Sequence, residues 1–229
     1  MSKPIIKVVI PAFNEENSVG NVVRDIPTDW VDEVVVVNNA STDATRTNAS
    51  EAGATVVDQP IKGYGNACLK GLAYLRETSP PDIVVFLDAD YSDYPEELVK
   101  VVDPIVKDQA DMVIGSRALG NRERGSMTFP QVFGNWLATS LLKLFYGVKF
   151  TDLGPFRAIR WQELEALGMV DQTYGWTVEM QLKAAKHKLR CTEVAVAYRK
   201  RIGKSKVSGT VKGTILAGYK ILWTIFRYL

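Results

Sequence analysis

The sequence predicts an α/β fold in which a mostly parallel sheet is flanked by helices. Short β-branched apolar runs alternate with helical patterns through the first half of the chain. Such alternation implies right-handed crossovers between parallel strands. The run from Ile83 to Leu87 contains no polar residue, as expected for a strand that is buried on both faces of a sheet. Polar and charged residues follow each apolar run, which indicates a site at one edge of that sheet.

The first half of the chain is expected to contain five strands and four helices. The strands are Ile5–Ile10, Glu33–Val37, Thr55–Val57, Ile83–Leu87 and Met112–Ile114. The helices are Glu16–Asp25, Thr42–Ala52, Gly65–Arg76 and Pro95–Lys107.

Each of these helices follows a start signal. Asn14 can cap the first helix, and acids follow it in the first turn. The polar segment Asn38–Asp43 precedes the second helix, and a glycine-containing turn at Gly63 precedes the third. Ser92 and Asp93 stand before Pro95, a residue favoured in a first helical turn.

The second half of the chain is less regular. A charged loop at Arg122–Ser126 is expected to be mobile, because it contains a glycine and no apolar residue. Further helices are expected at Pro130–Tyr146, Thr177–Lys188 and Thr210–Leu229, and a strand at Cys191–Tyr198. We therefore expect one main α/β domain, residues 1–209, followed by a C-terminal amphipathic helix, residues 210–229.

Composition excludes several classes of function. The chain has 229 residues, 46% hydrophobic and 24% charged, with a net charge of +2. This is typical of a soluble protein with one good-sized domain, and the modest charge gives no support to nucleic-acid binding. His187 is the single histidine, which excludes a histidine-rich zinc site and disfavours a Ser-His-Asp triad. Neither a signal peptide nor a spanning helix is expected, which predicts a cytoplasmic protein.

Asp88 and Asp90 are the most informative residues of the chain. They follow the buried run that ends at Leu87, and side chains two apart in an extended segment point the same way. Two neighbouring carboxylates are costly there unless a cation lies near them. Oxygen ligands suit Mg²⁺ or Mn²⁺, so we expect a metal ion that holds a nucleotide. The alternative is a pair of aspartates that merely caps the following turn.

The carboxyl ends of the expected strands bring further polar segments together. These segments are Pro11–Glu16, Asn38–Asp43, Asp58 with Lys62–Ala67, Asp88–Asp90 and Gly115–Arg117.

In series, these segments resemble the motifs of family 2 glycosyltransferases with the GT-A (Rossmann-like) fold. The second half resembles the branch of that family that includes dolichyl-phosphate mannose and glucose synthases. The matching stretches there are Thr151–Arg157, Tyr174–Met180 and Arg201–Lys206.

The resemblance implies a nucleotide-sugar donor, a divalent cation and inversion at the anomeric carbon. It places Asp88 near the donor ribose or the metal, and Asp90 on the metal. The residues implied to bind the nucleoside are Pro11, Phe13, Glu15, Asn39, Asp43, Gly63 and Asp88. The family commonly has two acidic residues where Asn38 and Asn39 stand, and an amide can donate as well as accept hydrogen bonds.

Three residues are candidates for the reaction centre. Asp152 precedes a Gly-Pro bend, and Glu179 lies near Trp176 and Met180 on one helical side, an environment that could raise its pKa. The alternative for Glu179 is an ordinary helix-surface residue. Arg117 is the third candidate, because a cation stabilises the charge of the departing diphosphate.

The basic loop from Arg199 is the other candidate for phosphate binding. Together with Arg117, the expected phosphate-binding residues are Arg201, Lys204, Ser205 and Lys206. The alternative is a solvated basic loop with no ligand.

The segment Ile215–Leu229 is apolar, with aromatic and basic residues. On a helix it would suit peripheral contact with the cytoplasmic face of a membrane. Alternatively, it packs on its own domain or on the twin subunit of a homodimer.

These expectations combine into one function. The chain is expected to transfer a hexose, from UDP-glucose first and GDP-mannose second, to polyprenyl phosphate. One alternative is a soluble or glycan hydroxyl acceptor, which would need Asp152 or Glu179 as a base. Another is a non-catalytic nucleotide-binding protein.

Overall fold

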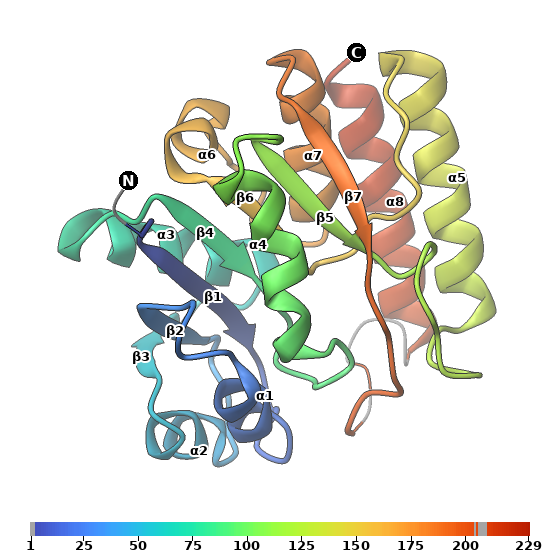
Figure 1. Ribbon diagram of the computed structural model, residues 1–229. Helices are drawn as coiled ribbons and strands as arrows, with labels where there is room; N and C mark the ends of the chain where they lie inside the picture. The colour runs from blue at the N-terminus through green and yellow to red at the C-terminus, as the bar shows by residue number, and fades with distance from the viewer. Residues whose placement is uncertain (1–2, 204, 206–209) are drawn as a thin grey trace.

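The structure, a computed structural model, describes residues 3–203, 205 and 210–229. Its centre is a seven-stranded sheet in the order β3-β2-β1-β4-β6-β5-β7 (Figure 1). The strands are β1 (Ile6–Ala12), β2 (Glu33–Asn38), β3 (Thr55–Asp58), β4 (Ile83–Phe86), β5 (Met112–Ser116), β6 (Arg157–Arg160) and β7 (Cys191–Ala195).

Helices cover both faces of this sheet. They are α1 (Val19–Asp25), α2 (Thr45–Glu51), α3 (Tyr64–Thr78), α4 (Leu98–Val106), α5 (Phe129–Tyr146), α6 (Trp161–Leu167), α7 (Trp176–Lys186) and α8 (Val211–Arg227). A short 3-10 helix, Pro95–Glu97, leads into α4. One core cluster joins the sheet to α1, α2 and α4. The other joins it to α3, α5, α6, α7 and α8.

The predicted α/β fold is confirmed, and the five strands expected in the first half are all present. β1 pairs in parallel with β2 and β4, and β2 with β3. The Val and Ile side chains of β1 and β4 are buried on both faces, which is the usual environment of a central parallel strand, whereas those of the edge strand β3 are partly buried.

Two elements were not predicted. β6 runs antiparallel between β4 and β5, and α6 follows it directly. β6 has only four residues, with arginines at both ends, so it lacks the apolar run by which the other strands were recognised. The predicted starts of α1 and α2 were also three residues too early, because turns at 13–18 and 39–44 precede both helices.

The C-terminal helix α8 packs beside α5 and α7 (Figure 1). Ile225 is fully buried in the core, and the Tyr146 hydroxyl donates to the Ile225 carbonyl at 2.7 Å. Within the described residues, no helix has both the length and the apolar character needed to span a membrane.

Candidate active site

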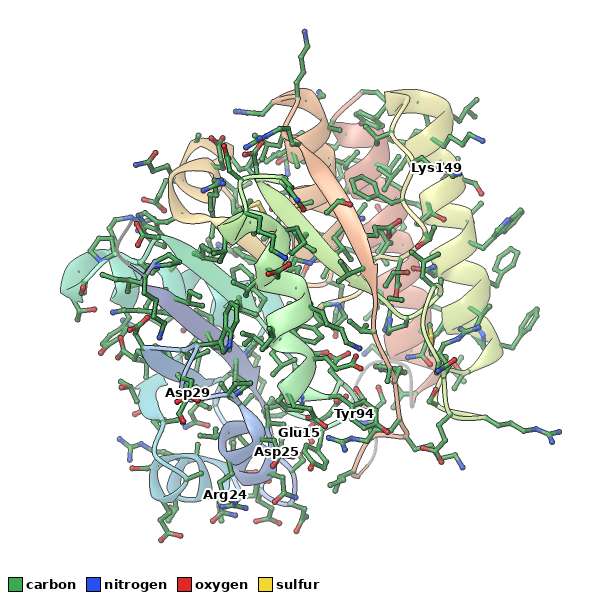
Figure 2. All side chains as sticks on the ribbon, in the orientation of Figure 1. Glu15, Arg24, Asp25, Asp29, Tyr94 and Lys149 are labelled. Carbon is green, nitrogen blue, oxygen red and sulfur yellow. The ribbon has the colours of Figure 1, made fainter. Side chains whose placement is uncertain are left out.

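The predicted site residues collect beyond the carboxyl ends of the central strands, as parallel topology requires. The strand order places β1 between β2 and β4, so the segments after these three strands are neighbours. Figure 2 labels Glu15 at this edge, beyond the end of β1. Asn14, Ala40 and Tyr91 have positive φ of 53°, 57° and 61° just after these strands. The backbone therefore turns sharply at each of the three strand ends.

Asp88 and Asp90 follow β4 with different partners. The Tyr64 hydroxyl donates to Asp88 Oδ1 at 3.0 Å. Asp90 is 7% exposed, and its Oδ1 accepts from the Ser92 amide at 2.9 Å and the Ser92 hydroxyl at 2.5 Å. Burial first, and the charge of Asp90 second, raise the pKa of Asp88 to about 7. The negative charge of this pair of carboxylates is therefore only partly compensated by neighbouring positive charge.

Arg201 supplies part of that compensation. Its guanidinium lies 3.0 Å from Asp90 Oδ2 and donates to Glu15 Oε1 at 2.6 Å. It thus bridges the ends of β1 and β4 from the basic loop, which was predicted to bind phosphate. Arg201 and Ser205 both line the cavity described below. Lys204 and Lys206, the other loop residues predicted to bind phosphate, lie outside the described residues.

Arg117 and Asp152 form a buried pair beside Asp88. The Arg117 amide and Nε both donate to Asp152 Oδ2 at 2.8 Å, and Nη2 donates to Oδ1 at 2.7 Å. Burial of Asp152 opposes its ionisation, but the charge and hydrogen bonds of Arg117 outweigh burial and lower its pKa. The Arg117 guanidinium also stacks over the Tyr198 ring at 5.1 Å. Asp152 is therefore an ionised group that orients Arg117.

Asp93 is a further buried acid near this pair. It is 2% exposed, and neither carboxylate oxygen accepts a hydrogen bond from a described residue. Burial, and then the charge of Asp88, raise its pKa well above the ordinary value. The sequence interpretation treated Asp93 only as part of a helix start. Its position in a buried turn next to Asp90 became apparent only in the fold.

The predicted nucleoside residues lie on the other side of Asp88, at the ends of β1 and β2. Pro11 is in β1, and the Lys62 ammonium lies 4.5 Å from the centre of the Phe13 ring. Asp43 Oδ1 accepts from the Thr45 amide at 3.0 Å. Although burial acts to raise the pKa of Asp43, its hydrogen bonds with Thr45 and Glu16 lower it overall.

Asn39 is engaged within the protein. Its Nδ2 donates to the carbonyls of Gln59 and Ile61 at 3.2 and 2.7 Å, and its Oδ1 accepts from the Gly63 amide at 2.8 Å. These bonds use both the donor and the acceptor character of an amide. Asn39 therefore holds the 59–63 loop against β2, and its contact with a base stays a prediction.

Gly63 and Gly65 have a packing role that the sequence did not indicate. A Cβ on Gly63, whose φ is 145°, would lie 2.3 Å from the Gln172 carbonyl oxygen. One on Gly65 would lie 2.0 Å from that of Asp171. The backbone approach at this turn is therefore to the 171–172 segment. A nucleotide contact for Gly63 stays a prediction.

Glu179 lies apart from Asp88 and Asp90. It is fully buried on α7, where it accepts from the Asp171 amide and the Tyr228 hydroxyl, each at 2.8 Å, and pairs with Lys183 at 2.8 Å. It lines a second cavity of about 240 Å³ that is bounded by α8. It is not an ordinary helix-surface residue, and a catalytic role for it stays a prediction.

A cavity of about 560 Å³ extends from the carboxylates to the C-terminal helix. Its charged end is formed by Asp88, Asp90, Arg117 and Arg201. Its walls include Pro130 and Gly134 of α5, Gly218 and Ile221 of α8, and the loop residues Leu153 and Pro155. A Cβ on Gly134 or Gly218 would meet no atom within 4 Å. The space between the first halves of α5 and α8 is therefore open rather than closely packed.

The sequence interpretation missed the contributions of several residues to this cavity. Tyr64 reaches Asp88, Tyr198 lies under Arg117, and α5 forms one wall. Tyr64 lies in the segment Lys62–Ala67, which the sequence placed at the edge of the site, but its side chain was given no role. The sequence predicted the helix Pro130–Tyr146 but not that it borders the site, because only tertiary packing brings α5 to the cavity that Asp88 and Asp90 line.

The comparisons with known proteins agree with this geometry. The model of the family described as glycosyl transferase family 2 matches residues 7–167. An uncharacterised glycosyltransferase of Mycobacterium tuberculosis (strain ATCC 25618 / H37Rv) is 37% identical over 220 residues, which are 95% of this chain and 96% of that protein. An undecaprenyl-phosphate mannosyltransferase of Micrococcus luteus is 29% identical over 91% of this chain and 89% of its own.

A solved structure shares the fold. Glucosyl-3-phosphoglycerate synthase from Mycobacterium tuberculosis, crystallised with Mn²⁺, UDP and phosphoglyceric acid, superposes with a TM-score of 0.75 at 22% identity. The match covers 98% of this chain and 78% of that one. The family match over most of the chain and the 37% identity to a full-length relative show that this protein is a family 2 glycosyltransferase with the GT-A fold.

Proposed function

We propose that this glycosyltransferase moves a hexose from a nucleotide-diphosphate sugar to a polyprenyl phosphate. The observation that carries the proposal is the cavity, which joins a charged end to walls formed by α5 and α8. A phosphate at its charged end would meet Arg117 and Arg201, while an isoprenoid chain would follow the apolar walls. The mannosyltransferase of Micrococcus luteus, by its name, acts on undecaprenyl phosphate.

Among the described residues of the cavity, the two predicted metal ligands are the only carboxylates that could act as a base, which supports a phosphate acceptor. Among the described residues that line the cavity, the carboxylates are Asp88 and Asp90, and no histidine is present. Asp152 is bound to Arg117, and Glu179 faces α8. A hydroxyl acceptor needs a group that takes its proton. A phosphate monoester is already ionised near neutral pH, so it needs none.

The chain's own residues supply binding and orientation. In the proposed displacement, a phosphate oxygen forms the new bond to the anomeric carbon as the bond to the nucleoside diphosphate breaks on the opposite face. Arg201 and Arg117 lie where they can stabilise the negative charge of both phosphate groups. Asp152 holds the Arg117 guanidinium in one orientation.

The donor set fits a hard divalent cation, Mg²⁺ or Mn²⁺, on Asp88 and Asp90. No cluster of three or more His, Cys, Asp or Glu side chains within the described part of the chain is arranged to hold an ion. The two carboxylates would therefore share the ion with diphosphate oxygens and water, as is usual for Mg²⁺. The raised pKa of Asp88 also indicates that a bound cation would reduce the repulsion between the two carboxylates. Such an ion would neutralise charge on the departing diphosphate.

The test is transfer of label into a lipid. Purified protein is incubated with Mn²⁺, undecaprenyl phosphate and radiolabelled UDP-glucose or GDP-mannose, and the products are partitioned into organic solvent. We expect labelled lipid from one donor. Label that passes instead to a soluble phosphorylated acid would favour the second candidate acceptor, which the phosphoglyceric acid bound to the fold neighbour suggests.

A matched pair of variants tests the role of the cavity wall. Gly134→Leu places a side chain in the cavity lining on α5, at a position where its Cβ would meet no atom within 4 Å. We expect it to lower lipid labelling at least tenfold and to leave hydrolysis of the donor unchanged. Ser50→Leu, at an exposed position on α2 and away from the cavity lining, is the control. Equal lipid labelling by both variants would exclude the proposed path for the isoprenoid chain.

A further inference from the structure

Helix α5 exposes a row of large apolar side chains. Phe129, Phe133, Trp136 and Leu144 are 81%, 49%, 59% and 72% exposed. Their spacing of four, three and eight residues keeps them on one face of a helix. Neighbouring rings touch, with centroids 6.3 Å apart for Phe129 and Phe133 and 5.8 Å apart for Phe133 and Trp136. Figure 2 shows side chains that stand out from α5 on the side away from the sheet.

Helix α8 exposes a second row beside the first. Ile215, Tyr219, Trp223 and Phe226 are 64%, 64%, 50% and 50% exposed, again at helical spacing. The ends of the two helices meet where the Phe145 and Phe226 rings pack at 5.7 Å. Their first halves line the same cavity. The helices therefore run side by side in the same direction, and the two rows belong to one continuous surface, which we call the α5–α8 face.

The segments that form and flank the α5–α8 face contain basic residues and no acidic ones, although Lys220 pairs with Asp171 of another segment at 2.9 Å. No aspartate or glutamate occurs in residues 124–150 or 196–229. The basic residues of these segments are Arg124, Lys143, Lys149, Arg199, Lys200, Arg201, Lys204, Lys206, Lys212, Lys220 and Arg227. Lys149 is labelled beside one end of α5 in Figure 2. The remainder of the chain carries a net negative charge, because the whole chain is only +2.

We propose that the α5–α8 face docks on an anionic lipid bilayer. Exposed Trp, Tyr and Phe side chains flanked by cations are typical of helices that lie in the headgroup region. Anionic headgroups attract basic residues near a membrane surface. The same charge disfavours a second copy as the occupant, since a two-fold dimer would place like charges opposite each other.

This docking surface would bring the enzyme to its lipid acceptor, and that role rests on the proposed function. The cavity lies between the two helices that form the face. A bilayer bound there would therefore adjoin the cavity, and a lipid phosphate could reach Arg117 while its isoprenoid tail stays in the membrane. The expectation from sequence was limited to the C-terminal helix, whereas α5 contributes the most exposed aromatic residue of the face.

The first test is binding to vesicles without any substrate. Full-length protein is mixed with vesicles of phosphatidylglycerol and phosphatidylcholine, or of phosphatidylcholine alone, and floated on a density gradient. We expect flotation with the anionic vesicles only, and its loss at high salt. Trp136→Glu on α5 and Trp223→Glu on α8 should each lower partitioning roughly tenfold. Val106→Glu, at a 41% exposed site on α4, should not.

The second test locates the contact. Brominated lipids quench tryptophans that enter the bilayer, and Trp161 and Trp176 are buried at 8% and 1% exposure. We expect quenching that is reduced in Trp136→Phe and in Trp223→Phe. Equal quenching in both variants and the wild type would overturn the proposal. So would light scattering that shows a dimer which Trp136→Glu converts to a monomer.

The outcome separates this surface from the acceptor assignment. If the protein binds anionic vesicles but forms no labelled lipid in the transfer assay, the docking proposal holds and the polyprenyl-phosphate acceptor is excluded. If the protein forms labelled lipid in detergent but does not bind anionic vesicles, the acceptor assignment holds and the docking proposal is excluded.

Discussion

Arg117 and Asp152, two residues predicted for the reaction centre, are joined by three hydrogen bonds of 2.7 to 2.8 Å. Asp152 is 1% exposed and has a lowered pKa. Because both of its oxygens accept from Arg117, the carboxylate is committed to holding the guanidinium. Asp152 therefore acts as a positioning residue for Arg117 in the proposed reaction.

We expect Asp152→Asn to destabilise the protein by about 3 kcal/mol, because it leaves a buried guanidinium without its counter-charge. Urea unfolding at pH 7.5 measures this loss. Asp103→Asn removes the exposed pair with Lys107 at 2.7 Å and should cost less than about 1 kcal/mol. Equal losses for the two variants would contradict the role given to the pair.

The pKa of Asp88 predicts an unusual dependence of stability on pH. Its pKa is raised from 3.8 to about 7 by burial and by Asp90. Between these two pH values the native state binds more protons than the unfolded state, so metal-free stability falls as pH rises through this range. The fall is about 1.4 kcal/mol for each pH unit over which Asp88 is protonated in the native state and ionised in the unfolded state.

We therefore expect Asp88→Asn to be more stable than the wild type at pH 8 in EDTA, and this advantage should shrink as pH falls below 7. Thermal unfolding across the pH range measures it. Asp29→Asn, at an exposed carboxylate labelled in Figure 2, is the control. A constant difference between Asp88→Asn and the wild type from pH 4 to 8 would contradict the assignment.

The regular part of this fold was predictable, but its tertiary placements were not. The strand Ile83–Phe86 and its carboxylates were recognised because a buried parallel strand is apolar throughout. By contrast, β6 contains a fully buried arginine, Arg157, whose guanidinium is satisfied by the carbonyls of Leu153, Gly154 and Thr177. No local pattern distinguishes such an arginine from one on a loop.

The site shows the same limit. Asp88 and Arg201 were assigned to it from strand ends and basic composition. Glu179 and Asn39 were assigned partners outside the protein, whereas the structure gives them internal ones. Which partner a polar side chain finds depends on packing that sequence spacing does not contain.

Arg201 pairs with Asp90, the residue predicted to bind the metal ion. Its guanidinium lies 3.0 Å from Asp90 Oδ2, so an ion bound there must overcome this pairing. We expect Arg201→Gln to bind Mn²⁺ alone several-fold more tightly but the nucleotide sugar with Mn²⁺ more weakly, since it also lacks a phosphate contact. Electron paramagnetic resonance and calorimetry measure the two affinities. Lys200→Gln is the control for loss of a positive charge in the same loop, and an identical response would exclude direct competition.

The variant Asn39→Asp tests why this chain has an amide at position 39, where the resemblance to the family predicts an acidic residue. Asn39→Asp turns an acceptor-only group toward the carbonyls of Gln59 and Ile61. We expect a loss of about 2 kcal/mol in unfolding free energy and a raised KM for the donor. Asn38→Asp faces Asp58 at a partly exposed site and should cost less. If Asn39→Asp matched the wild type in stability, its internal bonds would not be its main role.

The contact between α7 and α8 gives the last prediction. The Tyr228 hydroxyl donates to Glu179 at 2.8 Å, and burial together with Glu179 raises the pKa of Tyr228 to about 12. Tyr228→Phe should cost about 1 kcal/mol, and Glu179→Gln more, because Glu179 is fully buried and also pairs with Lys183. In a double-mutant cycle the two changes should couple by about 1 kcal/mol.

Tyr219→Phe, at a 64% exposed position on the same helix, should not couple to Glu179→Gln. The same proteins test catalysis. If Glu179 only positions α8, Glu179→Gln should lose activity in proportion to the increase in amide hydrogen exchange of α8. An inactive Glu179→Gln with wild-type stability and exchange would instead make Glu179 a group that touches the substrate, and would require α8 to move away from it during turnover.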